Sequence, residues 1–365
     1  MLLSESEKKR YNRHLILDKV GIEGQKRLKK ARVLVIGAGG LGCPVLLYLT
    51  AAGVGNIGII DFDTVDESNL QRQVIFTTED IGKNKALTAK ERLLARNNCI
   101  QITAFPERLT NENALELFSQ YDIIIDGTDN FSTRYLVNDA CVITNKPLVY
   151  GAIFKFEGQV TVFNYQNGPT YRCLFPTPPK VGSVPSCSDV GVLGVLPGLI
   201  GLQQANEALK IILQIGEILS GKLTIYNALG ADTTIVNITK NETAVTIAKD
   251  INFTTFNYDF FCGLTENKNN MKEISINDLA HFLEEKELQI LDVRMPWEQP
   301  KLNDERVINI PLQEIPQQVD RIDKSLKTLV FCQHGVRSVN CVEFLENQGF
   351  DKLINLREGI VDWKQ

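Results

Sequence analysis

Residues 33–61 read VLVIGAGGLGCPVLLYLTAAGVGNIGIID, and this stretch decides the fold. The apolar run from Val33 to Ile36 ends in a glycine-rich turn. A helical pattern follows, and a second apolar run ends at Asp61. Strand, glycine turn, helix and strand in this order form the βαβ unit of nucleotide-binding α/β folds.

Each glycine of the turn has a predicted task. Gly37 permits the tight turn, Gly39 and its neighbour Gly40 let a ligand approach the backbone, and Gly42 lets the helix pack close to the strand. The N-terminus of that helix offers free N–H groups to a phosphate. Asp61 ends the second strand, where a carboxylate can accept hydrogen bonds from a ribose hydroxyl.

The residues after Asp61 argue against a dehydrogenase. Asn69 and Arg72 follow closely in the sequence, and a dinucleotide site does not need them. A triphosphate site does, because the guanidinium group of arginine is a fixed fork for phosphate oxygens. Lys85 begins the next predicted helix, and two interpretations remain open for it: a surface lysine or a phosphate contact.

A third buried strand, residues 122–126, is followed by Gly127-Thr128-Asp129-Asn130. Ligands of open α/β sheets bind beyond the carboxyl ends of the strands, so Asp126 and Asp129 are expected on the same edge as the glycine loop. A carboxylate there can hold Mg²⁺, which bridges phosphates. The competing interpretation is that Asp129 and Asn130 only cap the helix that begins near Ser132.

The later part of this domain changes character. Residues 156–163 alternate as an antiparallel strand would, and residues 225–237 suggest further strands, so the sheet is predicted to be mixed. Residues 171–179 are predicted to be irregular because they contain Pro176, Pro178 and Pro179. Cys187 lies in a polar loop, where a thiol is more often incidental than catalytic. The uncharged run 190–206 is interrupted by glycines and Pro197, which predicts a buried turn and helix rather than a membrane span.

The polar, Asn-rich stretch 240–272 predicts a domain boundary, with a linker at residues 265–272. The second domain is predicted to begin with a helix at residues 275–285. Farther along, a predicted strand at residues 328–331 runs into Cys332 and a tight loop before a helix. Backbone N–H groups and the helix dipole would stabilise a thiolate or persulfide there, and Arg337 adds positive charge. Cys341, farther along the helix, is predicted to be a core residue.

Composition narrows the classes of function. A formal net charge of −5 over 365 residues gives no basic excess for nucleic acid binding. The N-terminus is polar and shows no signal peptide, so a cytoplasmic location is expected. The eight cysteines form no CxxC pair, which is typical of free thiols in a reducing compartment.

The motifs together resemble a known family. Residues 1–264 are similar to the ThiF/MoeB/HesA-type adenylyltransferases of ubiquitin-like sulfur carriers, relatives of the ubiquitin-activating enzymes. Residues 273–365 resemble a rhodanese domain. The matching motifs, in order, are RYNRHLIL, VLVIGAGGLG, GVGNIGIIDFDTVDESNLQRQ, IGKNKA, DGTDN, YRCLFP and CSDVGVLG, then LDVRMPWE, CQHGVRS and REGIVDW. The implied architecture is a Rossmann-like α/β adenylation domain with a mixed sheet, plus a small α/β rhodanese domain.

The resemblance also assigns roles. Asp61 would hold the ATP ribose, Asn69, Arg72 and Lys85 would contact the phosphates, and Asp129 would hold Mg²⁺. From the residues alone Arg13 reads as part of a solvated helix face, but in this family it reaches the site of the other subunit, which implies a homodimer.

For the transfer of sulfur, the resemblance implies two thiols. Cys332 would carry persulfide sulfur from a cysteine desulfurase or a similar donor to the adenylated carrier, giving a thiocarboxylate. Cys187 aligns with a cysteine that forms an acyl-disulfide with the carrier in some members.

The sequence departs from the family pattern at two places. The usual zinc site has two CxxC pairs, and here these positions are Thr170/Cys173 and Asp259/Cys262. We therefore expect zinc to be absent or loosely bound. The rhodanese segment between Trp297 and Val307 lacks the usual Gly-His-Ile turn, which affects its specificity. Two alternatives stay open at this point: a nicotinamide-dependent oxidoreductase, and a carrier-binding scaffold with an inert rhodanese domain.

Overall fold

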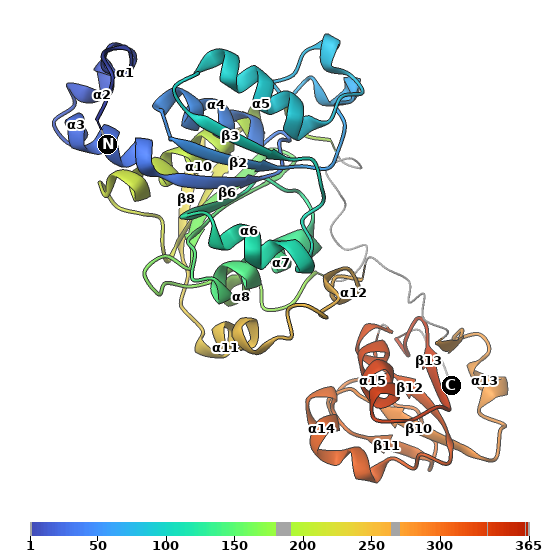
Figure 1. Cartoon of the computed structure of the whole chain (residues 1–365). Coiled ribbons are helices and arrows are strands. Elements are labelled where there is room, and N and C mark those ends of the chain that lie inside the picture. The colour runs from blue at the N-terminus through green and yellow to red at the C-terminus, as the bar shows by residue number, and fades with distance from the viewer. Residues whose placement is uncertain (1, 180–190, 264–270, 334, 362, 364–365) are drawn as a thin grey trace. The chain divides into compact units, whose positions relative to one another are not determined.

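The computed structural model describes residues 2–179, 191–263, 271–333, 335–361 and 363. It divides into two compact units, Met1–Cys262 and Gly263–Gln365 (Figure 1). Residues 264–270, most of the predicted linker, lie outside the described residues.

The first unit is built on one mixed sheet of eight strands in the order β3-β2-β1-β4-β5-β6-β7-β8. The first five strands in this order pair in parallel, and the last three are added antiparallel. This confirms the predicted mixed sheet. The strands are β1 (Arg32–Ile36), β2 (Asn56–Ile60), β3 (Gln101–Phe105), β4 (Ile123–Asp126), β5 (Leu148–Phe154), β6 (Glu157–Phe163), β7 (Lys222–Asn227) and β8 (Asp232–Asn237).

The parallel strands are buried on both faces, which is why they read as unbroken apolar runs. In β1, Val33 and Val35 point into one core and Leu34 and Ile36 into the other. The two cores are covered by different helices (Figure 1). The first set is α3 (Gly21–Lys30), α4 (Gly42–Ala52), α5 (Lys85–Arg96) and α10 (Val195–Leu213), and the second is α6 (Asn111–Ser119), α7 (Phe131–Ile143), α8 (Tyr171–Leu174) and α12 (Tyr258–Phe261). Helix α11 (Glu242–Asp250) packs outside them, in a small cluster with residues of α7 and α8.

The predicted N-terminal helical arm consists of α1 (Glu5–Arg10), α2 (Asn12–Leu15) and α3. A capping box between Ser4 and Glu7 begins α1. Leu28 of α3 is fully buried in the first core, so the arm is anchored at its C-terminal end.

The apolar run 190–206 forms the start of α10, whose Leu196 and Ile200 are buried against the sheet. The prediction of a buried helix is therefore correct for the described part of this run. In the part of the chain that the structure describes, no helix is both long and apolar enough to cross a membrane.

Two local predictions were wrong. Residues 171–174 are not irregular but form the short helix α8, because Thr170 and Cys173 cap its start and the prolines begin only at Pro176. The predicted helix at residues 275–285 is reduced to α13 (Leu279–Phe282).

The second unit is a parallel five-stranded sheet in the order β11-β10-β12-β13-β9. Its strands are β9 (Lys272–Ile274), β10 (Leu288–Asp292), β11 (Val307–Asn309), β12 (Lys327–Phe331) and β13 (Leu353–Leu356). Its other helices are α14 (Ile315–Gln318) and α15 (Val336–Asn347). Strand β9 begins inside the predicted linker and pairs with β13.

The glycine turn gives a matched pair of variants. A Cβ at Gly42 would overlap the carbonyl oxygen of Gly37 and lie 2.9 Å from its carbon, whereas a Cβ at Gly39 has no neighbour nearer than 3.8 Å. We expect Gly42→Ala to lower the free energy of unfolding by about 3 kcal/mol. Gly39→Ala should change it by less than about 1 kcal/mol. Urea denaturation of both variants measures the difference, and equal destabilisation would contradict this account of the turn.

Candidate functional site

The carboxyl ends of the central strands are level with one another. Ile36 at the end of β1 pairs with Ile60 at the end of β2 and with Asp126 at the end of β4. The loops that follow these three strands therefore leave the sheet side by side. These loops carry most of the site residues predicted from the sequence, at the edge where open α/β sheets bind ligands.

The glycine loop is held by backbone contacts. Gly37 has a φ of +90°, which favours glycine, and its N–H donates to the carbonyl of Ile60 at 2.9 Å. A Cβ at Gly127, after β4, would meet the carbonyl oxygens of Ile36 at 2.9 Å and Gly37 at 3.1 Å. Gly127 is thus needed for the close packing of two loops, a role that the sequence reasoning missed. The Cβ position of Gly39 has one neighbour within 4 Å, the side-chain nitrogen of Gln73 at 3.8 Å, so the backbone there is not crowded.

Asp61 ties the glycine loop to the end of β2. Its two carboxylate oxygens accept hydrogen bonds from the N–H of Ala38 at 2.8 Å and of Asp63 at 2.9 Å. Burial raises the pKa of Asp61, although these two hydrogen bonds and the charge of Lys85 oppose the shift. Each oxygen keeps a second lone pair, with which it could accept a hydrogen bond from a ribose.

Lys85 does not extend outward as a surface lysine. Only 8% of its side chain is exposed, and its Nζ lies 3.3 Å from a carboxylate oxygen of Asp63. Asn84 caps α5 by accepting from the N–H of Leu87, and its amide donates to the carbonyls of Asp61 and Asp63. The helix start that carries Lys85 is therefore fastened to the loop after β2, and a buried cation lies next to Asp61.

Asn69 and Arg72 follow on the same loop. Asn69 ends a single 3₁₀ turn, Glu67–Asn69, and Arg72 donates to the carbonyl of Ser68 at 3.1 Å. The Cδ of Arg72 lies 3.5 Å from the position that a Cβ would take at Gly40, so the aliphatic part of the Arg72 side chain lies along the glycine loop. The structure brings Arg72 and Lys85 to the same edge as Asp61.

The end of β4 carries a buried pair that the sequence reasoning did not identify. Asp126 accepts hydrogen bonds from the N–H of Thr128 at 2.9 Å and from its hydroxyl at 2.7 Å, and Arg134 donates to the Thr128 carbonyl at 3.1 Å. The other Asp126 oxygen and the Arg134 Nε are buried, 3.9 Å apart, and lack a hydrogen-bond partner. Burial raises the pKa of Asp126. Thr128 is therefore hydrogen-bonded to both Asp126 and Arg134, and these bonds fix the backbone that leads to Asp129.

Asp129 and Asn130 have different surroundings. Asn130 caps α7 by accepting from the N–H of Thr133 at 2.9 Å, as the structural alternative predicted. Asp129 is exposed at the same edge and has no hydrogen bond to another described residue. Its carboxylate is free for a cation, which fits the chemistry of Mg²⁺.

Two predicted residues are not brought to this edge within the described chain. Arg13 is exposed on α2. Cys187 lies outside the described residues.

The region expected for zinc is organised by hydrogen bonds. The sulfur of Cys173 accepts from the N–H groups of Thr170 and Asn241, each at 3.3 Å. Burial raises the pKa of Cys262 to about 12. Among the described residues, no group of three His, Cys, Asp or Glu side chains could hold a metal ion.

Beside these cysteines lies a buried ion pair. Arg172 donates to both carboxylate oxygens of Asp139 at 2.7 Å, and the Tyr258 hydroxyl donates to Asp139 at 2.9 Å. The guanidinium group of Arg172 also lies over the rings of Tyr135 and Phe261. This network joins α7, α8 and α12, the elements around the expected zinc positions.

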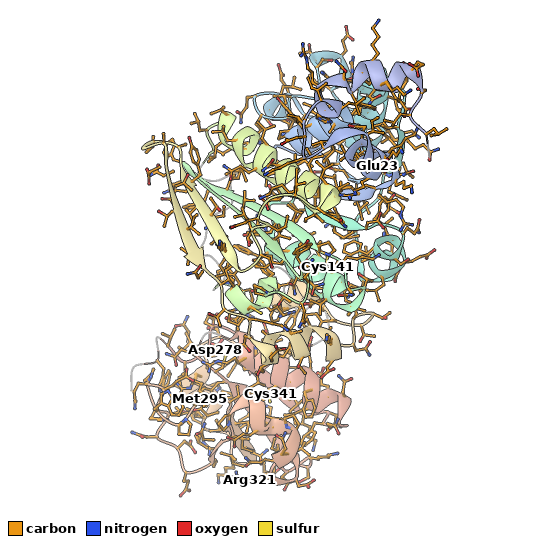
Figure 2. The ribbon with its side chains drawn as sticks, turned by 90° about the vertical axis from the view of Figure 1, so that its left-hand side faces the viewer. Glu23, Cys141, Asp278, Met295, Arg321 and Cys341 are labelled. Atoms are coloured by element: carbon orange, nitrogen blue, oxygen red, sulfur yellow. The ribbon has the colours of Figure 1, made fainter. Side chains whose placement is uncertain are left out.

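The second unit holds its predicted cysteine at the end of β12. Cys332 is buried, and the Ser338 hydroxyl lies 3.5 Å from its sulfur. Cys341 on α15 is fully buried, which confirms the core prediction, and burial raises its pKa to about 12. Figure 2 labels Cys341 on this helix and Cys141 on α7, whose pKa burial also raises.

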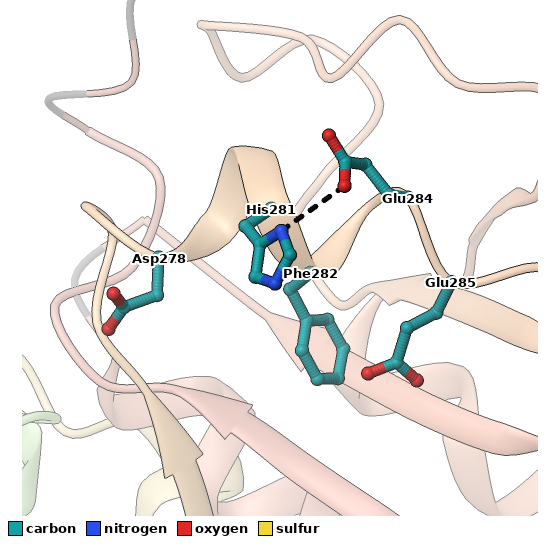
Figure 3. Close-up of a pocket in the computed structure, with 5 residues that line it drawn as sticks. All are labelled: Asp278, His281, Phe282, Glu284 and Glu285. Carbon is teal, nitrogen blue, oxygen red and sulfur yellow. Dashed lines mark hydrogen bonds and ion pairs between the residues drawn. The ribbon is translucent and has the colours of Figure 1, made fainter.

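One hollow on the described surface of the second unit lies away from the predicted site residues. It has a volume of about 270 Å³ and is lined by Asp278, His281, Phe282, Glu284 and Glu285 (Figure 3). His281 and Glu284 face each other across it at 3.2 Å. None of these residues belongs to the sites predicted from the sequence, and the hollow is shallow and open, so we attach no catalytic role to it.

Two family models match the chain. The ThiF family model matches residues 11–246, and the rhodanese-like domain model matches residues 275–365. The chain belongs to the ThiF family. It carries a C-terminal rhodanese-like domain, as the sequence motifs predicted.

Relatives with both domains are enzymes. The chain is 42% identical to a probable adenylyltransferase/sulfurtransferase MoeZ of Mycobacterium tuberculosis, over 99% of this chain and 94% of the relative. It is 39% identical to the adenylyltransferase and sulfurtransferase MOCS3 of Arabidopsis thaliana, over 99% and 84%. A sulfur carrier protein adenylyltransferase of Thermus thermophilus is 51% identical over 72% of this chain and its own full length. The chain is accordingly an adenylyltransferase with a sulfurtransferase domain, and the oxidoreductase and inert-scaffold alternatives are not favoured.

Solved structures agree on the fold. MccB of E. coli with ATP matches with a TM-score of 0.56 at 23% identity, over 66% of this chain and 75% of that chain. PaaA matches with a TM-score of 0.56 at 24% identity, over 66% and 76%. At this identity the likeness supports the fold alone.

The loop before Lys85 depends on Asp80, which is 1% exposed. Burial alone would raise its pKa, but hydrogen bonds from Arg92, Thr77 and Lys83 hold that pKa well below its usual value of 3.8. Because the folded pKa is lowered, this stabilisation is complete above about pH 4 and is lost as the pH falls further. We expect Asp80→Asn to lower the free energy of unfolding by about 2 kcal/mol at neutral pH. The difference from wild type should shrink as the pH falls from 4 to 2.

The matched control is Glu79→Gln, which removes the same charge from the neighbouring, exposed side chain 3.9 Å from Arg92. It should change stability by less than about 0.5 kcal/mol. Denaturation as a function of pH measures both variants. A pH-independent loss in Asp80→Asn would show that the charge of Asp80 is not what stabilises the loop.

Proposed function

We propose that this enzyme activates the C-terminal glycine of a ubiquitin-like sulfur carrier with ATP and then delivers sulfur to it from Cys332. The relatives named for adenylyltransferase and sulfurtransferase activity support the two steps, and the Thermus relative, named for a sulfur carrier, supports the partner. The observation that carries the proposal is the buried Lys85 ammonium group beside Asp61, with Arg72 along the glycine loop.

In the first step, a carboxylate oxygen of the carrier attacks the α-phosphorus of ATP, and pyrophosphate leaves. The product is an acyl-adenylate, and no covalent bond to the protein forms. Catalysis therefore rests on positioning and on neutralising the phosphate charge. The glycine loop would cradle the phosphates, Asp61 would bind the ribose, and Asn69, Arg72 and Lys85 would contact the phosphate oxygens. Asp129 would hold Mg²⁺, which supplies further positive charge when bound.

In the second step, the terminal sulfur of a Cys332 persulfide attacks the activated carboxyl carbon, and AMP leaves. The resulting acyl-disulfide is released when a thiolate, for which Cys187 is a candidate, attacks the Cys332 sulfur: the sulfur–sulfur bond breaks, the thiocarboxylate leaves, and a disulfide forms between that thiol and Cys332, to be reduced by an external thiol. The persulfide itself would come from a cysteine desulfurase or a similar donor. Molybdopterin, thiamine and tRNA thiolation pathways all use such products.

The arm suggests that the enzyme works as a homodimer. Arg13 is exposed among apolar side chains that are also exposed: Ile16 (65%), Leu17 (50%) and Ile22 (51%). Covering these side chains with a second copy would bury apolar surface. It would also carry Arg13 to the partner's nucleotide, where a guanidinium fork suits phosphate.

Exchange of labelled pyrophosphate into ATP, tested against a panel of sulfur carriers, measures the first step. Lys85→Ala and Arg13→Ala should each lower carrier-dependent exchange about 100-fold, because each removes a cation from the phosphates. Cys332→Ala should leave exchange unchanged and abolish thiocarboxylate formation. Absence of exchange with every carrier would overturn the proposal, and loss of exchange in Cys332→Ala would overturn the division of labour.

Two controls sharpen the role of Arg13. Arg10→Ala removes a guanidinium from the same arm, but Arg10 donates to the carbonyl of Arg96 in its own chain at 3.0 Å, so exchange should persist. Mixing Arg13→Ala with Lys85→Ala protein should restore about a quarter of wild-type exchange, because half of the dimers are mixed and each has one intact site. No recovery on mixing would show that Arg13 serves its own subunit.

We also propose that the fold does not need zinc. The Cys173 sulfur already accepts two backbone hydrogen bonds, and the other two positions of the family's cysteine pairs are Thr170 and Asp259, whereas a structural zinc is held mainly by thiolates and imidazoles. Metal analysis should find well below one zinc per chain, and a chelator should leave the melting temperature unchanged. Asp139→Asn should instead lower the free energy of unfolding by about 3 kcal/mol, because it leaves Arg172 buried and unpaired. A stoichiometric zinc content would reject this proposal.

A further inference from the structure

The loop that carries Cys332 is clamped by the segment after β10, residues 294–300. Gln333, next to Cys332, accepts a hydrogen bond from Arg294 at 2.8 Å and donates to the carbonyl of Gln299 at 2.9 Å. Arg294 also donates to the carbonyl of Pro300 at 2.9 Å. Arg294 is fully buried and paired with Asp292, so the clamp rests on the end of a core strand.

The far end of the loop is held by a different residue of the same segment. Glu298 accepts a hydrogen bond from each terminal nitrogen of the Arg337 guanidinium, both at 2.7 Å. The N–H of Met295 donates to the same carboxylate at 2.8 Å, which fixes the carboxylate orientation. Both terminal nitrogens of Arg337 therefore donate to Glu298, a two-point pairing that fixes the plane of the guanidinium group.

We propose that Glu298 is a positioning residue for sulfur transfer at Cys332: it fixes the Arg337 guanidinium and balances the positive charge that the sulfur experiences. The inference rests on the proposed role of Cys332 as the sulfur carrier. Charge matters at this point because thiolate and persulfide are anions. Arg337 alone favours both anions, and its pairing with Glu298 keeps the local charge near neutral.

Few other described charges face the sulfur. From β10 come Asp292 and Arg294, which neutralise each other at 2.9 Å. From α15 comes Cys341, whose raised pKa keeps it uncharged, and Ser338 contributes a neutral hydroxyl. A single conservative substitution in the Arg337–Glu298 pair therefore changes the net charge near the sulfur. The pair holds the pKa of Glu298 at about 2, so it is intact throughout the neutral range.

Thiosulfate provides a simple donor for the test. The Cys332 thiolate attacks the outer sulfur of thiosulfate, the sulfur–sulfur bond breaks, and sulfite leaves with the electron pair. Cyanide then takes the terminal sulfur of the persulfide as thiocyanate, and the thiolate is restored. Thiosulfate carries two negative charges, so its KM reports the local charge at Cys332.

The variants are made in the full-length protein. Glu298→Gln removes the negative charge and keeps an oxygen that can accept from Arg337. It should lower the KM for thiosulfate about threefold or more and shift half-maximal alkylation of Cys332 by iodoacetamide to lower pH. Arg337→Gln should move both values in the opposite direction. The double variant should lie close to wild type in both values, because the two opposite charges of the pair are removed together.

Three further variants distinguish a failure of the inference about Glu298 from a failure of the proposed function. Glu298→Asp retains the charge and should keep the wild-type pH midpoint even if the shorter side chain lowers the melting temperature. Glu285→Gln breaks a similar ion pair with Lys327, also at 2.7 Å, and should alter neither value. Cys332→Ala should abolish thiocyanate formation, and activity remaining in it would reject the proposed function itself. An unchanged KM and pH midpoint in Glu298→Gln, with Cys332→Ala inactive, would overturn the inference about Glu298 alone.

Discussion

The first unit depends on a place where backbone packs directly against backbone. Gly42 at the start of α4 lies against the carbonyl of Gly37, and Gly127 after β4 lies against the carbonyls of Ile36 and Gly37. No side-chain atom fits between these segments. As a result, the N-terminus of α4, the end of β1 and the end of β4 converge within one small region, and the polar groups of three loops are brought to a common edge. The hydrogen bonds of Asp61 and the position of Lys85 follow from this convergence.

Under the proposed function, the two units would hold different anions. At the sheet edge of the first unit, Arg72 and Lys85 both lie on the segment from β2 to the start of α5, and Lys85 is paired with Asp63. In the second unit, the cysteine loop is short and its arginine is already paired with a carboxylate. A triphosphate needs several cations at fixed distances. A single persulfide anion needs only a loop of N–H groups and a local net charge near zero.

The central strands and the residues at their ends could be predicted from the sequence, because both are encoded locally. Apolar runs ending in glycine or aspartate mark the carboxyl ends of strands, and residues 33–61 and 122–130 contain such signals. Lys85 remained ambiguous because a helix start does not reveal which way its side chain turns. Arg134, Tyr258 and Glu298 were missed for another reason: their partners lie 6 to 119 residues away along the chain, and no local pattern connects them. The short helix α8 was missed because nearby prolines dominated the reading of that stretch.

The buried Asp139 carboxylate has a consequence for the order in which the chain acquires its structure. Its partner Arg172 follows 33 residues later, but the Tyr258 hydroxyl that completes its hydrogen bonding follows only after 119. During synthesis, α7 and α8 can therefore form their ion pair well before α12 exists. The segment from Asn241 to Phe261 is among the last parts of the first unit to be synthesised, so the Tyr258 hydrogen bond can form only after the partners of Asp139 on α7 and α8 are available. Contacts between residues far apart in the sequence form late in folding. We therefore expect that the first unit cannot finish folding until its C-terminal aromatic residues have been synthesised.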